Sequence, residues 1–171
     1  MNRQKLAKRY RSLWLGETTS SLLFIALFLN YALADGDWRN WIVRGYSLAV
    51  VLLILLQGIV WWRWKLRVLK ADQPTIPPNI LRGFAGFRTV NWSLIALFPL
   101  VVAAKWAVTH ELWPSTDLLI GSLVMVGALL EQINYYHYQL MYDNAYDWDY
   151  LRRNRRLRQG NIGKALSQQR L

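Results

Sequence analysis

Four long apolar segments, separated by short segments rich in lysine and arginine, constrain what this chain can fold into. They are SLLFIALFLNYALA (21–34), YSLAVVLLILLQGIVWW (46–62), WSLIALFPLVVAAKWAV (92–108) and LLIGSLVMVGALL (118–130). With its flanking aromatic residues each reaches roughly 17 to 24 residues, enough at about 1.5 Å per residue to cross a hydrocarbon core of about 30 Å. The pattern predicts an all-α polytopic membrane protein, an antiparallel bundle of four transmembrane helices. The expected helices cover about 18–34, 43–64, 90–108 and 115–138.

The basic residues alternate with the apolar segments. Of the 21 lysines and arginines, only Arg39 and Arg44, in the connection after the first segment, and Lys105, near the outer end of the third, lie on the opposite side from the rest. Short loops rich in lysine and arginine stay in the cytoplasm. We therefore expect both termini and the middle loop to be cytoplasmic, and we expect Lys105 to reach from its helix to the outer interface.

The two ends of the single expected domain, residues 1–171, are basic. Residues 1–16 carry apolar side chains at helical spacing with cations between them, which favours an amphipathic helix on the inner membrane surface. The alternative is a basic flank that only orients the first helix. Residues 143–171 are expected to form a basic cytoplasmic tail.

One motif near the first apolar segment allows a second interpretation. Ala32, Leu33 and Ala34 before Asp35 are typical of a signal-peptide cleavage site. The long, partly apolar stretch ahead of the segment favours an uncleaved helix instead. Cleavage would leave three helices with the same orientation.

Polar residues gather in the expected cytoplasmic half of all four helices, which makes this layer the candidate site. Its members are Glu131, Gln132, Asn134, Tyr135, Tyr138, Gln57, Thr18, Ser21 and Asn91. Helical spacing places Glu131, Asn134, Tyr135 and Tyr138 on one face. We expect Glu131 to face Gln57 and the hydroxyls of residues 18–21, because a carboxylate exposed to acyl chains is costly. The layer is either a polar pocket for a headgroup, cation or proton, or a set of interhelical hydrogen bonds.

Several classes of chemistry find no support. The chain has no cysteine, which excludes disulfides and thiolate ligands or nucleophiles. Its two histidines, His110 and His137, are expected on opposite sides of the membrane, so they cannot share a haem. No nucleophile with a base and an orienting group is apparent, so we predict no catalytic residue, metal or cofactor.

A cluster of arginines follows the fourth helix. Its members are Arg152, Arg153, Arg155, Arg156 and Arg158. Clusters next to a membrane attract anionic lipids, at about 1 kcal/mol per cation. The same charges also orient the helix. Nucleic-acid binding is not required to explain them.

The end of the fourth helix resembles the closing segment of small, uncharacterised bacterial four-helix membrane proteins. The matching residues are Glu131, Asn134, Tyr135, Gln139, Leu140, Tyr142 and Asp143. The resemblance covers about a tenth of the chain and implies a multi-pass protein of the bacterial inner membrane. It implies no activity.

These observations favour a non-enzymatic membrane protein that acts as a subunit or as a partner- or lipid-binding element, alone, as a homo-oligomer or in a larger complex. A small oligomeric transporter or channel with a cation or proton site at Glu131 is the alternative. A lipid-modifying enzyme is a third class, without a recognisable catalytic set.

Overall fold

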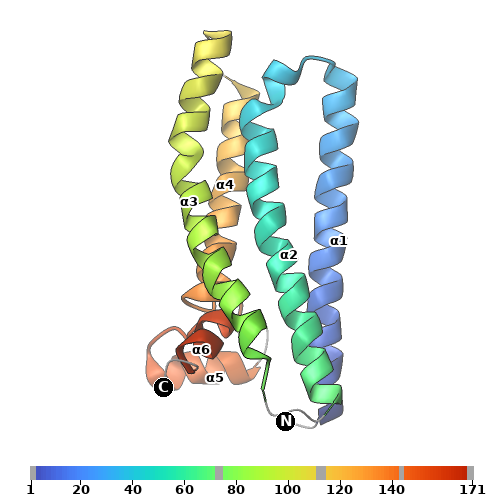
Figure 1. Ribbon diagram of the computed structural model, residues 1–171, viewed down its shortest axis with the longest axis vertical. Coiled ribbons are helices and arrows are strands. Elements are labelled where there is room, and N and C mark those ends of the chain that lie inside the picture. The colour runs from blue at the N-terminus through green and yellow to red at the C-terminus, as the bar shows by residue number, and fades with distance from the viewer. Residues whose placement is uncertain (1–2, 72–74, 111–114, 143–144, 169–171) are drawn as a thin grey trace.

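The computed structural model describes residues 3–71, 75–110, 115–142 and 145–168. Within these ranges the regular elements are helices and no strand is present. In chain order they are α1 (Arg3–Asp35), the 3-10 helix η1 (Trp38–Trp41), α2 (Ile42–Lys70), α3 (Pro78–Thr109), α4 (Thr116–Tyr136), α5 (Ala145–Asn154) and α6 (Asn161–Gln168) (Figure 1). Asp143, the last residue of the resemblance and the first of the predicted tail, lies outside the described residues.

The long helices coincide with the four apolar segments. Among the described residues, α1, α2, α3 and α4 are each long and apolar enough to cross a membrane. Figure 1 shows them side by side, with successive helices running in opposite directions. The prediction of an all-helical chain with four helices able to span a membrane is confirmed.

α1 differs from the expectation at its start. The helix runs without a break over Arg3–Asp35, so the expected separate amphipathic helix over 1–16 is instead, from its third residue on, the first half of α1. No proline interrupts this stretch, and its aromatic side chains pack on α2: the rings of Tyr10 and Trp62 stack with centroids 5.7 Å apart. Its 33 residues span about 50 Å, longer than a hydrocarbon core of about 30 Å.

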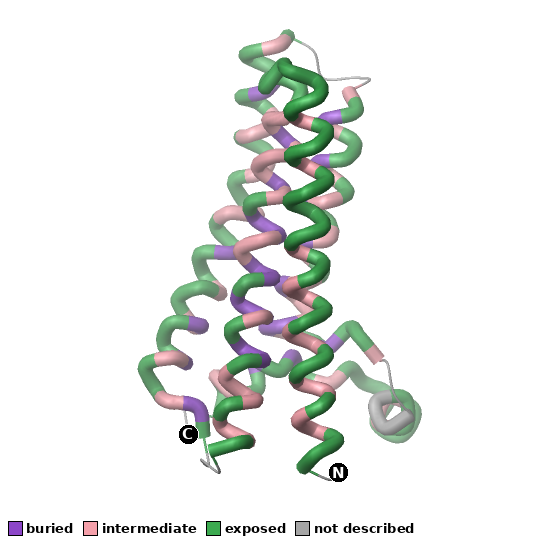
Figure 2. The backbone as a smooth tube through the Cα atoms, turned by 90° about the vertical axis from the view of Figure 1, so that its right-hand side faces the viewer, coloured by how far each residue is buried: buried purple, intermediate pink, exposed green. Residues whose placement is uncertain are grey.

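α2 is the central helix of the four. It packs against α1, α3 and α4 and contributes ten buried residues, whereas α1 has none (Figure 2). The buried core includes Ile54, Trp61, Phe84, Ala128 and Ile162. Large apolar side chains of α1, among them Leu22, Leu23, Leu29 and Leu33, are exposed. A helix that is apolar over its exposed surface is suited to contact with lipid.

Asp117 joins three helices at the end of the molecule opposite the termini. Its carboxylate forms ion pairs with Lys105 (2.7 Å) and Arg44 (3.2 Å). It also accepts the backbone N–H groups of Val43 (3.0 Å) and Arg44 (2.8 Å), which lie in the first turn of α2 and have no partner within the helix. Lys105 is only 3% exposed. The expectation that it reaches the outer interface is therefore wrong, because Asp117 offers a buried partner.

α4 ends at Tyr136, earlier than predicted. The backbone N–H of Tyr138 donates to the carbonyl of Ile133 (2.8 Å), and the side chain of Asn134 accepts the N–H of Leu140 (2.9 Å). These bonds turn the chain away from the helix axis. The spacing predicts that Tyr138 shares a helix face with Glu131. That prediction is wrong, because Tyr138 lies beyond the end of α4 and is 54% exposed.

The C-terminal tail folds back under α4, where α6 packs against α4 and α3. Ile162 is fully buried there. The approach depends on two glycines: a Cβ on Gly163 would collide with the carbonyl of Tyr136, and one on Gly160 would lie 2.6 Å from that of Tyr135. α5 and α6 lie at the same end of the molecule as the start of α1 (Figure 1).

Candidate functional site

Two separate polar groups replace the single layer that the sequence predicted. The first is an amide cluster between α2, α3 and α4. Gln57 and Asn91 exchange two side-chain hydrogen bonds of 2.9 Å, and Asn91 also donates to Gln132 (2.8 Å). Tyr136 donates its hydroxyl to Gln57 (2.7 Å), and Gln132 donates to the carbonyl of Arg88 (3.3 Å).

This amide cluster is suited to holding helices together. Gln57, Asn91 and Gln132 are all buried, and each side chain has its hydrogen bonds within the protein. In an apolar environment such bonds join helices. For these three residues the geometry favours the interpretation as interhelical hydrogen bonds.

The second polar group surrounds Glu17, which joins α1 to both of its neighbours. One carboxylate oxygen accepts the hydroxyl of Tyr135 (2.6 Å) and the indole N–H of Trp62 (2.7 Å). The other oxygen, Oε2, is buried without a hydrogen-bond partner. It lies against Gly58 of α2, where a Cβ would collide with both Glu17 and Tyr135.

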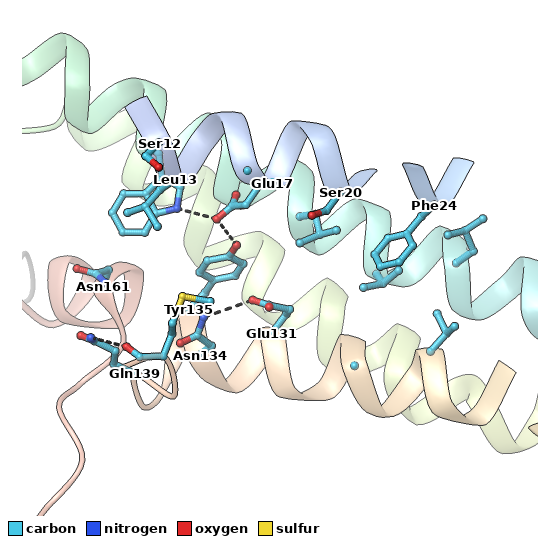
Figure 3. A pocket seen from close by; sticks show the side chains of 18 of the residues that line it. Ser12, Leu13, Glu17, Ser20, Phe24, Glu131, Asn134, Tyr135, Gln139 and Asn161 are labelled. Atoms are coloured by element: carbon cyan, nitrogen blue, oxygen red, sulfur yellow. Dashed lines mark hydrogen bonds between the residues drawn. The ribbon is translucent and has the colours of Figure 1, made fainter. Parts of the chain in front are cut away.

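Beside Glu17 a groove of about 690 Å³ opens between α1, α2 and α4 (Figure 3). Its polar end is lined by Arg9, Ser12, Glu17, Ser20, Glu131, Asn134, Gln139 and Asn161. Its apolar wall is lined by Phe24, Leu48, Val51, Leu55, Ile120, Leu123 and Val124. The groove exists because α1 and α4 both pack on α2 and not closely on each other.

A second cavity continues the groove away from its polar end. It has a volume of about 780 Å³ and shares Phe24, Leu48, Ile120 and Val124 with the first. Its further lining is mostly apolar until Asp35 and Arg44 at the opposite end; it includes Leu27, Phe28, Tyr31 and Trp41. The two cavities adjoin along the side of the molecule, with polar side chains at both ends and apolar side chains between them.

Glu131 lies in this groove and not in the amide cluster. Its carboxylate accepts the side-chain amide of Asn134 (3.3 Å), and it lies close enough to Glu17 for the two charges to repel each other. The expectation that Glu131 faces Gln57 is wrong, since Gln57 is occupied by Asn91 and Tyr136. Neighbouring positions on α4 point to different helices, which separates Glu131 from Gln132.

Three other predicted site residues lie outside both groups. The hydroxyls of Thr18 and Ser21 donate to carbonyls one turn earlier in α1, at Trp14 (2.7 Å) and Glu17 (2.8 Å). They do not reach Glu131 as expected. Tyr138 lies beyond the end of α4 and lines a different cavity, beside His137.

The arginine cluster lies at the end of α5 and in the turn that follows. Arg152, Arg153, Arg155 and Arg156 are exposed. The guanidinium of Arg158 lies over the ring of Tyr150, 4.5 Å from its centroid. The exposed members present positive charge at the same end of the molecule as the polar end of the groove.

Sequence reasoning missed Glu17, Trp62 and Asp117. Glu17 was assigned to the chain ahead of a first helix expected to begin at Thr18, one position later. Asp117 lies in the expected helix 115–138, but no partner is predicted for it. For Glu17 and Asp117 the available signal is the acidic side chain itself. Both residues lie within a few positions of a long apolar segment, where a carboxylate needs a partner.

Comparison with protein-family models, curated proteins and solved structures finds no match to this chain. Among the described residues no group of three or more histidine, aspartate or glutamate side chains is placed to hold a metal ion. The groove brings two carboxylates to the end of a long apolar wall.

Proposed function

We propose that this chain is a non-enzymatic protein of the bacterial inner membrane, a four-helix bundle with both termini in the cytoplasm, that binds a lipid-like amphiphile in the groove between α1 and α4. The observation that carries the proposal is the groove itself, which is polar at one end and apolar along its length. An amphiphile has the same division between a polar headgroup and an apolar chain. The basic segments beside the polar end support a cytoplasmic location for that end.

The exposure of the groove walls supports binding from the bilayer. Leu123 on α4 is 64% exposed, and Phe24 and Ile120 are exposed as well. In a membrane these side chains contact acyl chains, so an amphiphile enters sideways without crossing a polar barrier. The exposed arginines after α5, which do not line the groove, attract anionic lipids to the membrane surface at the same end of the protein.

A small transporter or channel is the second candidate, favoured by the paired carboxylates Glu17 and Glu131. An ion that passed them would meet the mostly apolar continuation lined by Leu27 and Phe28, where charged side chains return only at Asp35 and Arg44. The geometry therefore supports binding of an amphiphile better than passage of an ion.

Gly127 provides a test of the proposal. It lines the groove, and a Cβ there would meet no atom within 4 Å, so Gly127→Leu fills the groove without a collision at its first carbon. Gly86→Leu on α3 is the matched control, since Gly86 also faces open space and does not line the groove. Both variants are purified in mild detergent, and retained lipid is measured by native mass spectrometry.

We expect the wild type and Gly86→Leu to retain the same bound amphiphile and Gly127→Leu to lose most of it. Equal retention by all three proteins would show that the lipid binds elsewhere. The absence of any bound amphiphile in the wild type would contradict the proposal directly.

A further inference from the structure

Two acidic side chains, Glu17 and Glu131, and one basic side chain, Arg9, line the polar end of the groove. Among the described residues no lysine or arginine forms an ion pair with Glu17 or Glu131. At the other end of the molecule, by contrast, the carboxylate of Asp117 forms ion pairs with both Lys105 and Arg44. The groove therefore has a local excess of negative charge beside an apolar wall.

The two carboxylates differ in what they can bind. Glu17 is engaged by Tyr135 and Trp62, and its second oxygen is buried against Gly58. It contributes charge without offering an exposed oxygen. Glu131 is only partly buried, and its one hydrogen bond is a long one of 3.3 Å from Asn134. Glu131 is the carboxylate that a ligand can contact.

The order of groups along the groove limits the chemistry of the ligand. Glu131 and Glu17 lie where the apolar wall begins, so the group that meets them is attached directly to an apolar chain (Figure 3). An anionic headgroup would be repelled there. A primary ammonium carries the opposite charge and three N–H donors, and hydrogen bonds between charged groups are the strong ones. Ser20 lines the same end and offers a further acceptor.

We infer that the groove selects amphiphiles with a primary ammonium headgroup, bound through Glu131 with Glu17 adding to the negative charge, and with the alkyl chain along the wall of α1 and α4. This rests on the proposed function and names the ligand class of the same groove. The selection comes from charge and from N–H donors, and the apolar wall contributes equally to every amphiphile of the same chain length.

The test uses four amphiphiles with the same twelve-carbon chain: dodecylamine, dodecyltrimethylammonium, dodecanol and dodecanoate. Each is titrated into purified wild-type protein in a neutral detergent, and apparent Kd values are measured by native mass spectrometry. We expect dodecylamine to bind about 10-fold more tightly than dodecanol or dodecyltrimethylammonium, because only the primary ammonium offers charge-assisted N–H bonds. Dodecanoate should bind weakest.

The variant Glu131→Gln should reduce the advantage of dodecylamine over dodecanol to within about 2-fold while dodecanol binds as before, since one charged hydrogen bond accounts for most of the difference. Glu17→Gln keeps an acceptor for Tyr135 and Trp62 and should reduce the advantage less. Asp149→Asn is the control, because Asp149 is an exposed carboxylate of α5 outside the groove. It should leave all four Kd values unchanged.

The possible failures are distinguishable. If all four amphiphiles bind the wild type equally and Gly127→Leu weakens them all, the inference is overturned and the proposed function stands. If every amphiphile has the same Kd for Gly127→Leu as for the wild type, the groove is not the binding site and the proposed function itself fails. A preference for dodecylamine that survives in Glu131→Gln would also overturn the inference.

Discussion

The carboxylate of Glu17 meets the hydroxyl of Tyr135 at 2.6 Å, although the two residues are 118 positions apart in the chain. Their contact passes over Gly58 of α2, which has no side chain to keep them apart. The first and the fourth long helices are thus joined at one polar point, and the groove opens beside it (Figure 3).

Replacing Gly58 with alanine should separate Glu17 from Tyr135. The added Cβ would overlap both side chains, so we expect Gly58→Ala to destabilise the protein by about 1 to 3 kcal/mol, as overpacking does elsewhere. Thermal unfolding in detergent measures the change. Gly86→Ala is the control, because its Cβ meets open space and alanine favours a helix by up to about 1 kcal/mol. Equal stability of the two variants would contradict the packing described at Gly58.

Removing the carboxylate of Asp117 should be among the most damaging single changes. Asp117→Ala leaves the buried ammonium of Lys105 without a carboxylate, with only the carbonyl of Arg39 at 3.4 Å, and losing the carboxylate costs about 3 to 5 kcal/mol in comparable ion pairs. The double variant Asp117→Leu with Lys105→Met removes both charges and should be more stable than Asp117→Ala alone. Denaturant unfolding of the three proteins tests this order, and a reversed order would show that Lys105 reaches water after all.

The amide cluster should behave as a structural unit. Asn91→Ala removes bonds to Gln57 and Gln132, each worth about 0.6 to 2 kcal/mol between membrane helices. A double-mutant cycle with Gln57→Ala should show that the two losses are not additive, because the residues share their bonds. Ser93→Ala, an exposed position on α3, is the control. Amphiphile binding in the groove should be unaffected by Asn91→Ala if the variant remains folded.

The docking of α6 should depend on Gly163. Because the chain has no cysteine, Ile162→Cys introduces a single thiol, and burial should make it react slowly with a maleimide. Adding Gly163→Ala should force α6 away from the carbonyl of Tyr136 and speed the reaction at least about 10-fold, the effect of a loss of about 1.4 kcal/mol in docking. Asp149→Cys, already exposed, should react at the same rate in both backgrounds. If the thiol of Ile162→Cys still reacts slowly in the protein that also carries Gly163→Ala, α6 tolerates the added methyl group and the prediction is wrong.

The orientation across the membrane can be tested with single cysteines in intact cells. Trp38→Cys on η1 and Leu157→Cys after α5 are both at exposed positions, at opposite ends of the molecule. We expect a membrane-impermeant maleimide to label only Trp38→Cys from outside, because the basic segments stay in the cytoplasm. Labelling of Leu157→Cys in intact cells would reverse the proposed orientation.

Helix existence and number follow from the sequence alone. Four continuous apolar runs of this length favour helices in a bilayer, since a helix bonds every backbone group within its own segment, whereas the strands of a β-barrel are shorter and alternate in polarity. The same reasoning placed a polar layer at one end of these helices and selected Gln57, Asn91 and Gln132, which the structure brings together.

Only the tertiary structure decided how that layer divides. The spacing of residues along α4 does not specify which neighbouring helix each face contacts. Glu131 and Gln132 are adjacent in sequence, yet Gln132 belongs to the amide cluster and Glu131 lies in the groove. Long-range partners are equally invisible in the chain: Lys105 is buried because Asp117 is there, and Glu17 belongs to the groove because Gly58 leaves room for Tyr135. Periodicity specifies which residues share a side of one helix. The packing of helices against each other specifies what that side touches.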